Sequence, residues 1–188
     1  QFFGGGTHSE LGYQCNGTNA YANTFLVPSA VQQLNNNGLT IVVGTNATNL
    51  QTDVVEIGAF NDVNQASLIC VRNNNTDFRR QSRMNGSAIL QDNQNDSKGI
   101  FSSVRQSSSL SKIFRNQVEI ASGNSGGNLP NVNLYIGTLN LSGSPYNIGW
   151  SNQRIQMAII HDGLTDAEVV QLHQIIDVSE QIQGRKTW

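Results

Sequence analysis

The sequence predicts an all-β fold, an antiparallel sandwich that is followed by one C-terminal α-helix. About a dozen short apolar or alternating segments are separated by turn signals roughly every eight to twelve residues, which is typical of a sandwich. Between residues 130 and 160, apolar side chains alternate with polar ones, so each strand there has one buried face. From residue 165 onward the apolar period changes to three or four residues, which indicates a helix.

The expected strands follow one another along the chain, with turns rich in Asn and Gly between them. Residues 39–43 are largely β-branched, which predicts a buried strand. Asn85 and Gly86 form the strongest hairpin signal, because both residue types tolerate positive φ. Asn116 and Gln117 predict a second tight turn. The expected strands are 10–15, 20–26, 39–43, 53–60, 67–72, 78–84, 88–90, 99–105, 111–115, 118–121, 132–136 and 153–160.

The C-terminal helix is predicted over residues 165–183. Thr165 is suited to the N-cap, and Glu168 three residues later completes a capping box. Gly184 can adopt the left-handed conformation that ends a helix. One apolar face is expected to carry Val169, Leu172, Ile175, Ile176 and Ile182.

The domain organisation is expected to be simple. Residues 1–9 contain three consecutive glycines and are expected to be a flexible lead-in. Residues 10–188 are expected to form a single domain, because their number suits one sizeable core.

The surface is expected to be polar but weakly charged. The chain has 24 Asn, 18 Gly and a formal net charge of −2, which argues against steering toward nucleic acid or an anionic membrane. No apolar run is long enough for membrane insertion. Arg79, Arg80 and Arg83 form the only basic cluster, which we interpret as a solvated strand face. Whether Cys15 and Cys70 pair is open from sequence, but Cys70 lies in an apolar run and is expected to be a buried free thiol.

No catalytic constellation is evident. Glycoside hydrolysis requires two carboxylates that face one substrate. The closest pair, Asp53 and Glu56, is three residues apart on an expected strand, so the two side chains point to opposite faces. We interpret them as two solvated strand charges and expect that the protein is not an enzyme. His161 precedes the turn residues Asp162 and Gly163 and is expected to cap or line that turn.

A calcium site is the one cofactor hypothesis that the sequence raises. Asp62 and Asn64 offer oxygen ligands in one turn, and Asp96 offers another in a second Asn-rich turn. Neither turn matches an established calcium-binding spacing, and an Asx turn, in which the side chain accepts from its own backbone, is the simpler interpretation.

The best candidate for ligand binding is the loop 142–152. It contains Tyr146, Asn147, Trp150 and Asn152, which combine aromatic rings with amides that can bind sugar hydroxyls. The loop joins two expected strands, so it lies at an end of the sandwich, where loops often carry function. The alternative is that Trp150 begins the next strand and fills the core.

Four motifs resemble one known family. The sequences Gly17-Thr-Asn-Ala-Tyr21, Ile113-Phe-Arg-Asn-Gln-Val118, Leu134-Tyr-Ile-Gly137 and Leu164-Thr-Asp-Ala-Glu occur in an order that is similar to laminin-G-like, concanavalin A-like domains. The resemblance covers about residues 10–185 and implies a two-sheet jelly-roll sandwich. Related domains often hold one calcium ion at the rim of the sandwich, and many bind glycans or other surface ligands.

The nearest variants occur in bacteriophage virion proteins, as tail-fibre modules or other appendages. The resemblance therefore implies a non-enzymatic virion or surface-appendage module, which is extracellular and contacts host cell-surface glycans or neighbouring virion subunits. Fibre appendages are often homotrimers, which would form here through the parent protein. Two alternatives remain open on the same fold: a glycan-degrading enzyme and a purely structural decoration domain.

Overall fold

The computed structural model describes residues 1–48, 53–72, 80–86, 88–91, 96–124 and 126–188. The described elements, in chain order, are β1 (Phe2–Phe3), β2 (Thr7–Ser9), β3 (Gly12–Gln14), β4 (Tyr21–Asn23), α1 (Pro28–Val31), β5 (Asn37–Val43), β6 (Ile57–Asp62), β7 (Gln65–Cys70), β8 (Arg80–Met84), β9 (Ala88–Gln91), β10 (Gly99–Arg105), β11 (Ser111–Arg115), β12 (Val118–Gly123), β13 (Tyr135–Ile136), β14 (Leu139–Leu141), β15 (Ser144–Pro145), β16 (Arg154–His161) and α2 (Asp166–Ile182). Of the helices described, neither is long and apolar enough to cross a membrane.

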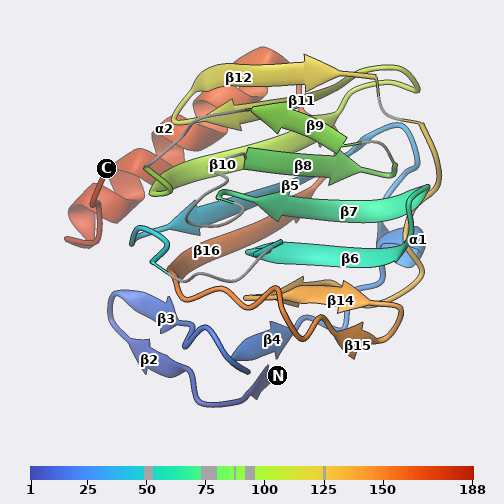
Figure 1. Ribbon diagram of the computed structural model, residues 1–188. Coiled ribbons are helices and arrows are strands. Elements are labelled where there is room, and N and C mark those ends of the chain that lie inside the picture. The colour runs from blue at the N-terminus through green and yellow to red at the C-terminus, as the bar shows by residue number, and fades with distance from the viewer. Residues whose placement is uncertain (49–52, 73–79, 87, 92–95, 125) are drawn as a thin grey trace.

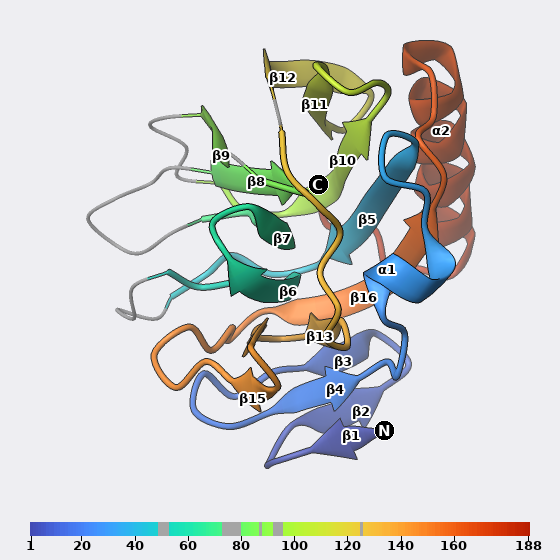
Figure 2. The ribbon, with the colours of Figure 1, turned by 90° about the vertical axis from the view of Figure 1, so that its right-hand side faces the viewer.

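The strands form two sheets that pack face to face, which confirms the predicted sandwich (Figures 1 and 2). Sheet A has the order β1-β4-β13-β6-β7-β8-β9, with β14 also paired to β6 and β15 paired to β14. Sheet B has the order β12-β11-β10-β5-β16-β3-β2. Among the described pairs, all are antiparallel except that of β14 with β6. Figure 2 shows the layers edge-on, with α2 against the outer face of sheet B.

Several expected elements match the structure closely. The strands β10 and β11 have the predicted bounds, and β5 begins two residues before the predicted start at Leu39. Between β11 and β12, Asn116 and Gln117 have φ of 46° and 75°, so the expected tight turn is confirmed. Asn85 also adopts positive φ, at 70°, in the expected turn between β8 and β9. The expected strand 132–136 is shorter in the structure, where β13 is only Tyr135–Ile136.

Residues 1–9 differ from the flexible lead-in that the glycine run suggested, because they contribute a strand to each sheet. β1 pairs with β4 at the edge of sheet A, and β2 pairs with β3 at the edge of sheet B. Gly4 has φ of 74°, and a Cβ there would lie 2.1 Å from the carbonyl oxygen of Asn19. The glycines therefore allow a close crossing from one sheet to the other rather than flexibility.

The main core lies between the sheets and borders the buried cation Arg80. Among its buried side chains are six from β5, β6, β7, β8 and β10: Leu39, Ile41, Ile57, Ile69, Met84 and Phe101. The Arg80 guanidinium lies 5.3 Å from the centre of the Phe101 ring. Because Arg80 is buried, the interpretation of the basic cluster as a solvated strand face was wrong for this residue. Arg79 lies outside the described residues.

The helix α2 begins and ends as predicted. The backbone N–H of Glu168 donates to the Thr165 hydroxyl at 3.3 Å, and the Thr165 N–H donates to the Glu168 carboxylate at 2.8 Å. This is the expected capping box. The helix packs on sheet B through Val169 and Ile176, which contact the outward side chains of β5, β10 and β11. The strands β5 and β10 are therefore buried on both faces.

The buried face of α2 matches only in part the one that the apolar period suggested: Val169, Leu172 and Ile176 pack on the sheet as expected. Ile175 and Ile182 were expected to pack on the sheet, but they are 69% and 80% exposed. The buried positions are Val169, His173, Ile176 and Glu180, and the Glu180 carboxylate forms an ion pair with Arg185. Successive helical residues are about 100° apart, so Ile175 and Ile176 cannot both face the sheet.

The neighbouring isoleucines allow a direct test of this packing. Ile176→Val should lower the free energy of unfolding by about 1 kcal/mol, because it removes a buried methylene group. Ile175→Val should change it by less than about 0.5 kcal/mol, because that side chain is largely exposed. Urea denaturation of the two variants would measure the difference. Equal losses would show that α2 is rotated relative to the packing described.

Candidate functional site

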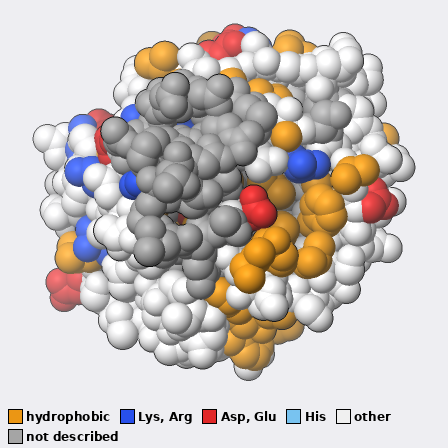
Figure 3. Space-filling view, in the orientation of Figure 1, with side chains coloured by type: hydrophobic (Ala, Val, Ile, Leu, Met, Phe, Trp, Pro, Cys, Tyr) orange, Lys and Arg blue, Asp and Glu red, His pale blue; other side chains and the backbone are white. Residues whose placement is uncertain are grey.

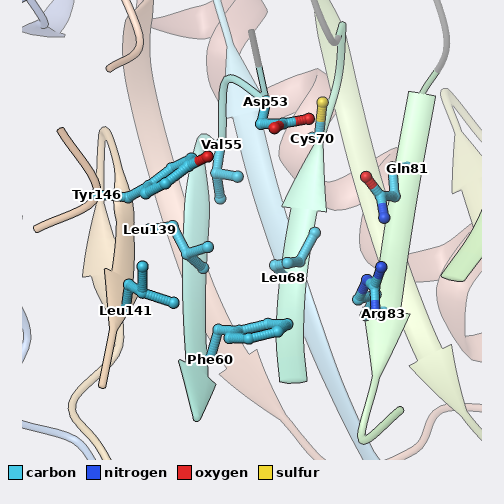
Figure 4. Close-up of a pocket in the computed structure, with 10 residues that line it drawn as sticks. All are labelled: Asp53, Val55, Phe60, Leu68, Cys70, Gln81, Arg83, Leu139, Leu141 and Tyr146. Carbon is cyan, nitrogen blue, oxygen red and sulfur yellow. The ribbon is translucent and has the colours of Figure 1, made fainter. Parts of the chain in front are cut away.

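A groove of about 310 Å³ lies on the outer face of sheet A. Its described lining comes from the segment before β6, from β6, β7, β8 and β14, and from the loop after β15. Figure 3 shows hydrophobic side chains gathered on this side of the molecule, with basic and acidic groups beside them. The lining residues, drawn in Figure 4, are Asp53, Val55, Phe60, Leu68, Cys70, Gln81, Arg83, Leu139, Leu141 and Tyr146.

Strand register explains why these side chains meet. In the β7–β8 pair, Leu68 lies opposite Arg83 and Cys70 lies opposite Gln81. Residues two apart on a strand share a face, so both members of each strand point outward. On the other side of β6, the parallel strand β14 places Leu141 beside Phe60. The strands β6, β7, β8 and β14 therefore present their outward side chains to one surface.

The floor of the groove is a small apolar cluster that is separate from the main core. Val55, Leu68, Cys70 and Leu139 are buried, and Phe60 and Tyr146 pack partly against them. Gly58 allows this packing, because a Cβ there would lie 2.7 Å from Leu139 Cδ1 and 2.9 Å from Leu68 Cβ. The floor thus offers an apolar surface with aromatic rings at its borders.

One rim of the groove is formed by two polar side chains of β8. The Arg83 guanidinium lies 5.9 Å from the centre of the Phe60 ring. Burial lowers the pKa of Arg83, and the charge of Asp53 opposes that shift. Within the described part of the chain, the side chains of Arg83 and Gln81 have no hydrogen-bond partner, and both face the groove (Figure 4). This role of Arg83 and Gln81 was not predicted from sequence, although the alternation Arg80-Gln81-Ser82-Arg83 separates the residues that face inward from those that face outward.

The opposite rim is formed by Asp53 and Tyr146. Asp53 precedes β6 and has φ of 55°, an unusual conformation for a residue other than glycine. Burial raises the pKa of Tyr146, and the charge of Asp53 and a hydrogen bond to its carboxylate raise it further. In Figure 4 the Tyr146 hydroxyl is directed toward this carboxylate.

The loop residues proposed from sequence lie in different surroundings. Of the four, Tyr146 alone is part of the described lining of the groove. Trp150 is 8% exposed, and its indole N–H donates to the carbonyl oxygen of the exposed Asn147 at 3.1 Å. The Asn152 amide donates to the Thr48 hydroxyl at 2.6 Å, away from the groove lining.

The carboxylates considered for calcium, Asp62 and Asp96, accept hydrogen bonds from nearby backbone N–H groups. Asp62 Oδ1 accepts from the backbone N–H of Asn64 at 2.7 Å, which is the Asx turn considered as the alternative. Asp96 accepts from the backbone N–H of Lys98 and forms an ion pair with Arg115. Both carboxylates are thus engaged by donors of the protein. Among the described residues, no group of three or more His, Cys, Asp or Glu side chains could hold a metal ion.

The closest carboxylate pair, Asp53 and Glu56, precedes β6 rather than lying on the expected strand 53–60, and one member is not solvated. Asp53 lies at the groove, whereas Glu56 is fully buried, so the interpretation of two solvated charges was wrong for Glu56. Its Oε2 accepts from the backbone N–H of Val71 at 2.8 Å. Burial raises the pKa of Glu56 to about 8, against the effect of hydrogen bonds from Val71 and Ser151.

The two cysteines lie near this buried carboxyl and are not linked. Cys15 and Cys70 are both free and buried, so the expected buried thiol at Cys70 is confirmed. Burial raises the pKa of Cys15 to about 12, with a smaller contribution from the charge of Glu56.

No protein-family model and no curated protein sequence matches the chain. Solved structures do resemble it. Domain 4 of AbnA, a GH43 extracellular arabinanase from Geobacillus stearothermophilus solved with arabinotriose, superposes with a TM-score of 0.58 at 17% identity, over 91% of this chain and 82% of that one. The CBM40 domain of the Ruminococcus gnavus IT-sialidase, bound to α2,3-sialyllactose, has a TM-score of 0.58 at 16% identity, over 86% of this chain and 96% of that one.

The receptor-binding domain of botulinum neurotoxin D also has a TM-score of 0.58, at 9% identity. The alignment covers 95% of this chain and 48% of the neurotoxin domain. The present chain thus spans about half the length of that domain. At such low identities these likenesses show the fold alone. The chain is thus a two-sheet antiparallel sandwich with a C-terminal helix, similar in architecture to carbohydrate-binding modules and to a toxin receptor-binding domain.

Proposed function

We propose that the protein is a non-enzymatic glycan-binding module and that the groove on sheet A is its binding site. The observation that carries this proposal is the composition of the groove. Its apolar floor and the rings of Phe60 and Tyr146 suit the C–H faces of a sugar. The rim groups Asp53, Gln81 and Arg83 suit its hydroxyls and other polar substituents.

The similar structures support this proposal by what they bind. The arabinanase domain was solved with arabinotriose and the CBM40 domain with α2,3-sialyllactose. Both resemble the present chain along most of its length. A fold hosts many functions, so the proposed function rests on the groove and not on the architecture.

The acidic groups favour binding over hydrolysis. Asp53 is the one carboxylate in the described lining of the groove. Glycoside hydrolysis requires two carboxyl groups about 5 to 10 Å apart across the substrate. Glu56, the nearest acid in sequence, is buried and cannot reach a sugar in this groove.

Within the loop 142–152, we assign different roles to the four candidate residues. Tyr146 contacts the sugar directly, because it lines the groove. Trp150 and Asn147 hold the loop through the hydrogen bond between them, and Asn152 ties its end to Thr48.

We also propose that the module is displayed outside the cell, on a secreted protein or a virion appendage. The support for a phage virion is the resemblance of the four sequence motifs, with neighbouring virion subunits and homotrimers of the parent protein as the partners it implies. A purely structural decoration domain would leave the groove without a ligand, which separates that alternative from ours.

A binding assay with one groove variant tests the proposed function. Glycan-array screening of the wild-type protein should identify binding glycans. Tyr146→Ala should then weaken binding to those glycans by about tenfold or more in calorimetry, because it removes an aromatic wall of the groove. Phe25→Ala is the matched control, since Phe25 is an aromatic side chain that is 59% exposed and lies outside the described lining of the groove. Binding to no glycan, or equal losses in both folded variants, would refute the proposal.

A further inference from the structure

Resting on the proposed function, we infer that the groove selects glycans that carry a carboxylate, and that Arg83 and Gln81 hold this group. The inference goes beyond glycan binding as such, because neutral and acidic sugars would both satisfy the proposed function. It depends on three features of the rim: a cation that has no hydrogen-bond acceptor among the described residues, a neighbouring amide donor, and a carboxylate beside Tyr146.

Arg83 is a half-buried cation without a hydrogen-bond acceptor among the described residues. It has lost part of its hydration to the Phe60 ring and to the apolar floor. A guanidinium in such a place gains most from an anionic partner, because charge-assisted hydrogen bonds strengthen as water is excluded. Of the described residues that line the groove, Arg83 is the only cation.

The geometry favours a planar anion. The Arg83 guanidinium presents parallel N–H groups in a fixed fork, which matches the two oxygens of a carboxylate. Gln81 projects from the same face of β8, two residues away, and its amide can donate a further hydrogen bond. The apolar floor formed by Leu68 and Leu139 lies next to this pair and can accept a methyl group or the C–H face of the ring.

Asp53 gives the groove a direction. It lies at the rim that Tyr146 forms, and its carboxylate accepts a hydrogen bond from the Tyr146 hydroxyl. A ligand carboxylate near Asp53 would be repelled, whereas sugar hydroxyls can donate to it. An acidic sugar therefore binds with its carboxylate toward Arg83 and its hydroxyls toward Asp53.

The test compares acidic and neutral glycans on the intact protein. A glycan array with sialylated, uronate-containing, sulfated and neutral members should give hits among the carboxylate-bearing members. Calorimetry with α2,3-sialyllactose, lactose and 3′-sulfolactose, or with matched pairs for the hits found, would measure the preference. Arg83→Gln should weaken binding of the carboxylate-bearing glycan by about tenfold or more. Binding of the neutral counterpart should change by less than about twofold.

Arg154→Gln is the matched control, because Arg154 is a half-buried arginine of β16 in sheet B, which donates to the Gly44 carbonyl. It should leave the preference unchanged. Equal binding of neutral and acidic glycans, or a preference for sulfate alone, would overturn the inference and leave the proposed function intact. Binding to no glycan of any class would overturn both.

Discussion

Replacing Glu56 by glutamine should make the protein more stable at alkaline pH and should remove most of its loss of stability above pH 5. The pKa of Glu56 is raised by burial from its ordinary value of 4.5 to about 8. Between these values the unfolded chain releases the proton while the folded protein keeps it. The free energy of unfolding therefore falls as pH rises, by roughly 5 kcal/mol in total.

Glutamine is the neutral counterpart of the protonated carboxyl and can keep the hydrogen bond from Val71 through its amide oxygen. The stability of Glu56→Gln relative to wild type should thus increase by on the order of 4 kcal/mol between pH 4.5 and pH 8. Comparing the two pH values cancels the effect of the substitution on packing. Urea denaturation of both proteins at each pH would measure their free energies of unfolding.

Glu10→Gln is the control for this prediction, because the Glu10 carboxylate is exposed whereas that of Glu56 is buried. Its relative stability should stay constant within about 0.5 kcal/mol. The prediction would be contradicted if the wild-type protein and Glu56→Gln had equally flat stability profiles between pH 4.5 and pH 8.

Replacing His173 should remove a loss of stability in acid. His173 lies on the buried face of α2, where its Nδ1 accepts from the backbone N–H of Gln117 at 2.8 Å. The proton of the neutral ring must then be on Nε2, which lies 2.7 Å from the Ser102 hydroxyl. Burial, and to a lesser degree the charge of His161, lower the pKa of His173 from 6.5 to about 4.

The same pattern of donors continues to a second histidine. The Ser102 and Thr40 hydroxyls lie 2.6 Å apart, and Thr40 lies 2.9 Å from Nε2 of His161. His161 Nδ1 then donates to the carbonyl of Asp162 at 2.6 Å, so the expectation that it lines this turn is confirmed. In this row of hydrogen bonds, from His173 through Ser102 and Thr40 to His161, each donor meets one acceptor only if both histidines are neutral.

Because the folded pKa of His173 lies below its unfolded value, its contribution to stability is complete above pH 6.5 and is lost as pH falls to about 4. The loss amounts to about 3 kcal/mol. Between pH 4.5 and pH 6.5 the contribution of Glu56 to the free energy of unfolding falls as pH rises, whereas that of His173 increases. The two effects therefore partly cancel in the wild-type protein.

The measurement is therefore best made in the Glu56→Gln background. There, adding His173→Gln should flatten the acid limb of the stability profile, whereas adding His8→Gln, at an exposed histidine of β2, should leave it steep. An imidazole of His173 that protonates near pH 6.5 in an NMR titration would refute the assignment.

Elements defined by neighbours in sequence could be predicted from sequence. The capping box of Thr165 and Glu168, the turn at Asn116 and Gln117, and the bounds of β10 and β11 depend on local hydrogen bonds, φ preferences and alternation. These features involve residues within a few positions of one another, so the local sequence specifies them without reference to tertiary contacts.

The candidate site could be predicted only in part. Tyr146 was found because aromatic and amide residues cluster in its loop. Arg83 was not, because it was grouped with Arg80 as one basic face, whereas Arg80 is buried beside Phe101 and Arg83 lies over Phe60 on the outside. The pairing of β7 with β8 and of β14 with β6 brings the lining together, and no local pattern specifies such pairings.

The fold class, the C-terminal helix with its caps, and the tight turns follow from the sequence alone, because each depends on chemistry between near neighbours. Which side chains are buried depends on how the two sheets and the helix pack together. Ile176 rather than Ile175 packs on sheet B, Glu56 is enclosed while Asp53 lies at the groove, and residues 1–9 close the edges of both sheets. Burial depends on which surfaces meet, and those surfaces are formed by segments far apart in the chain.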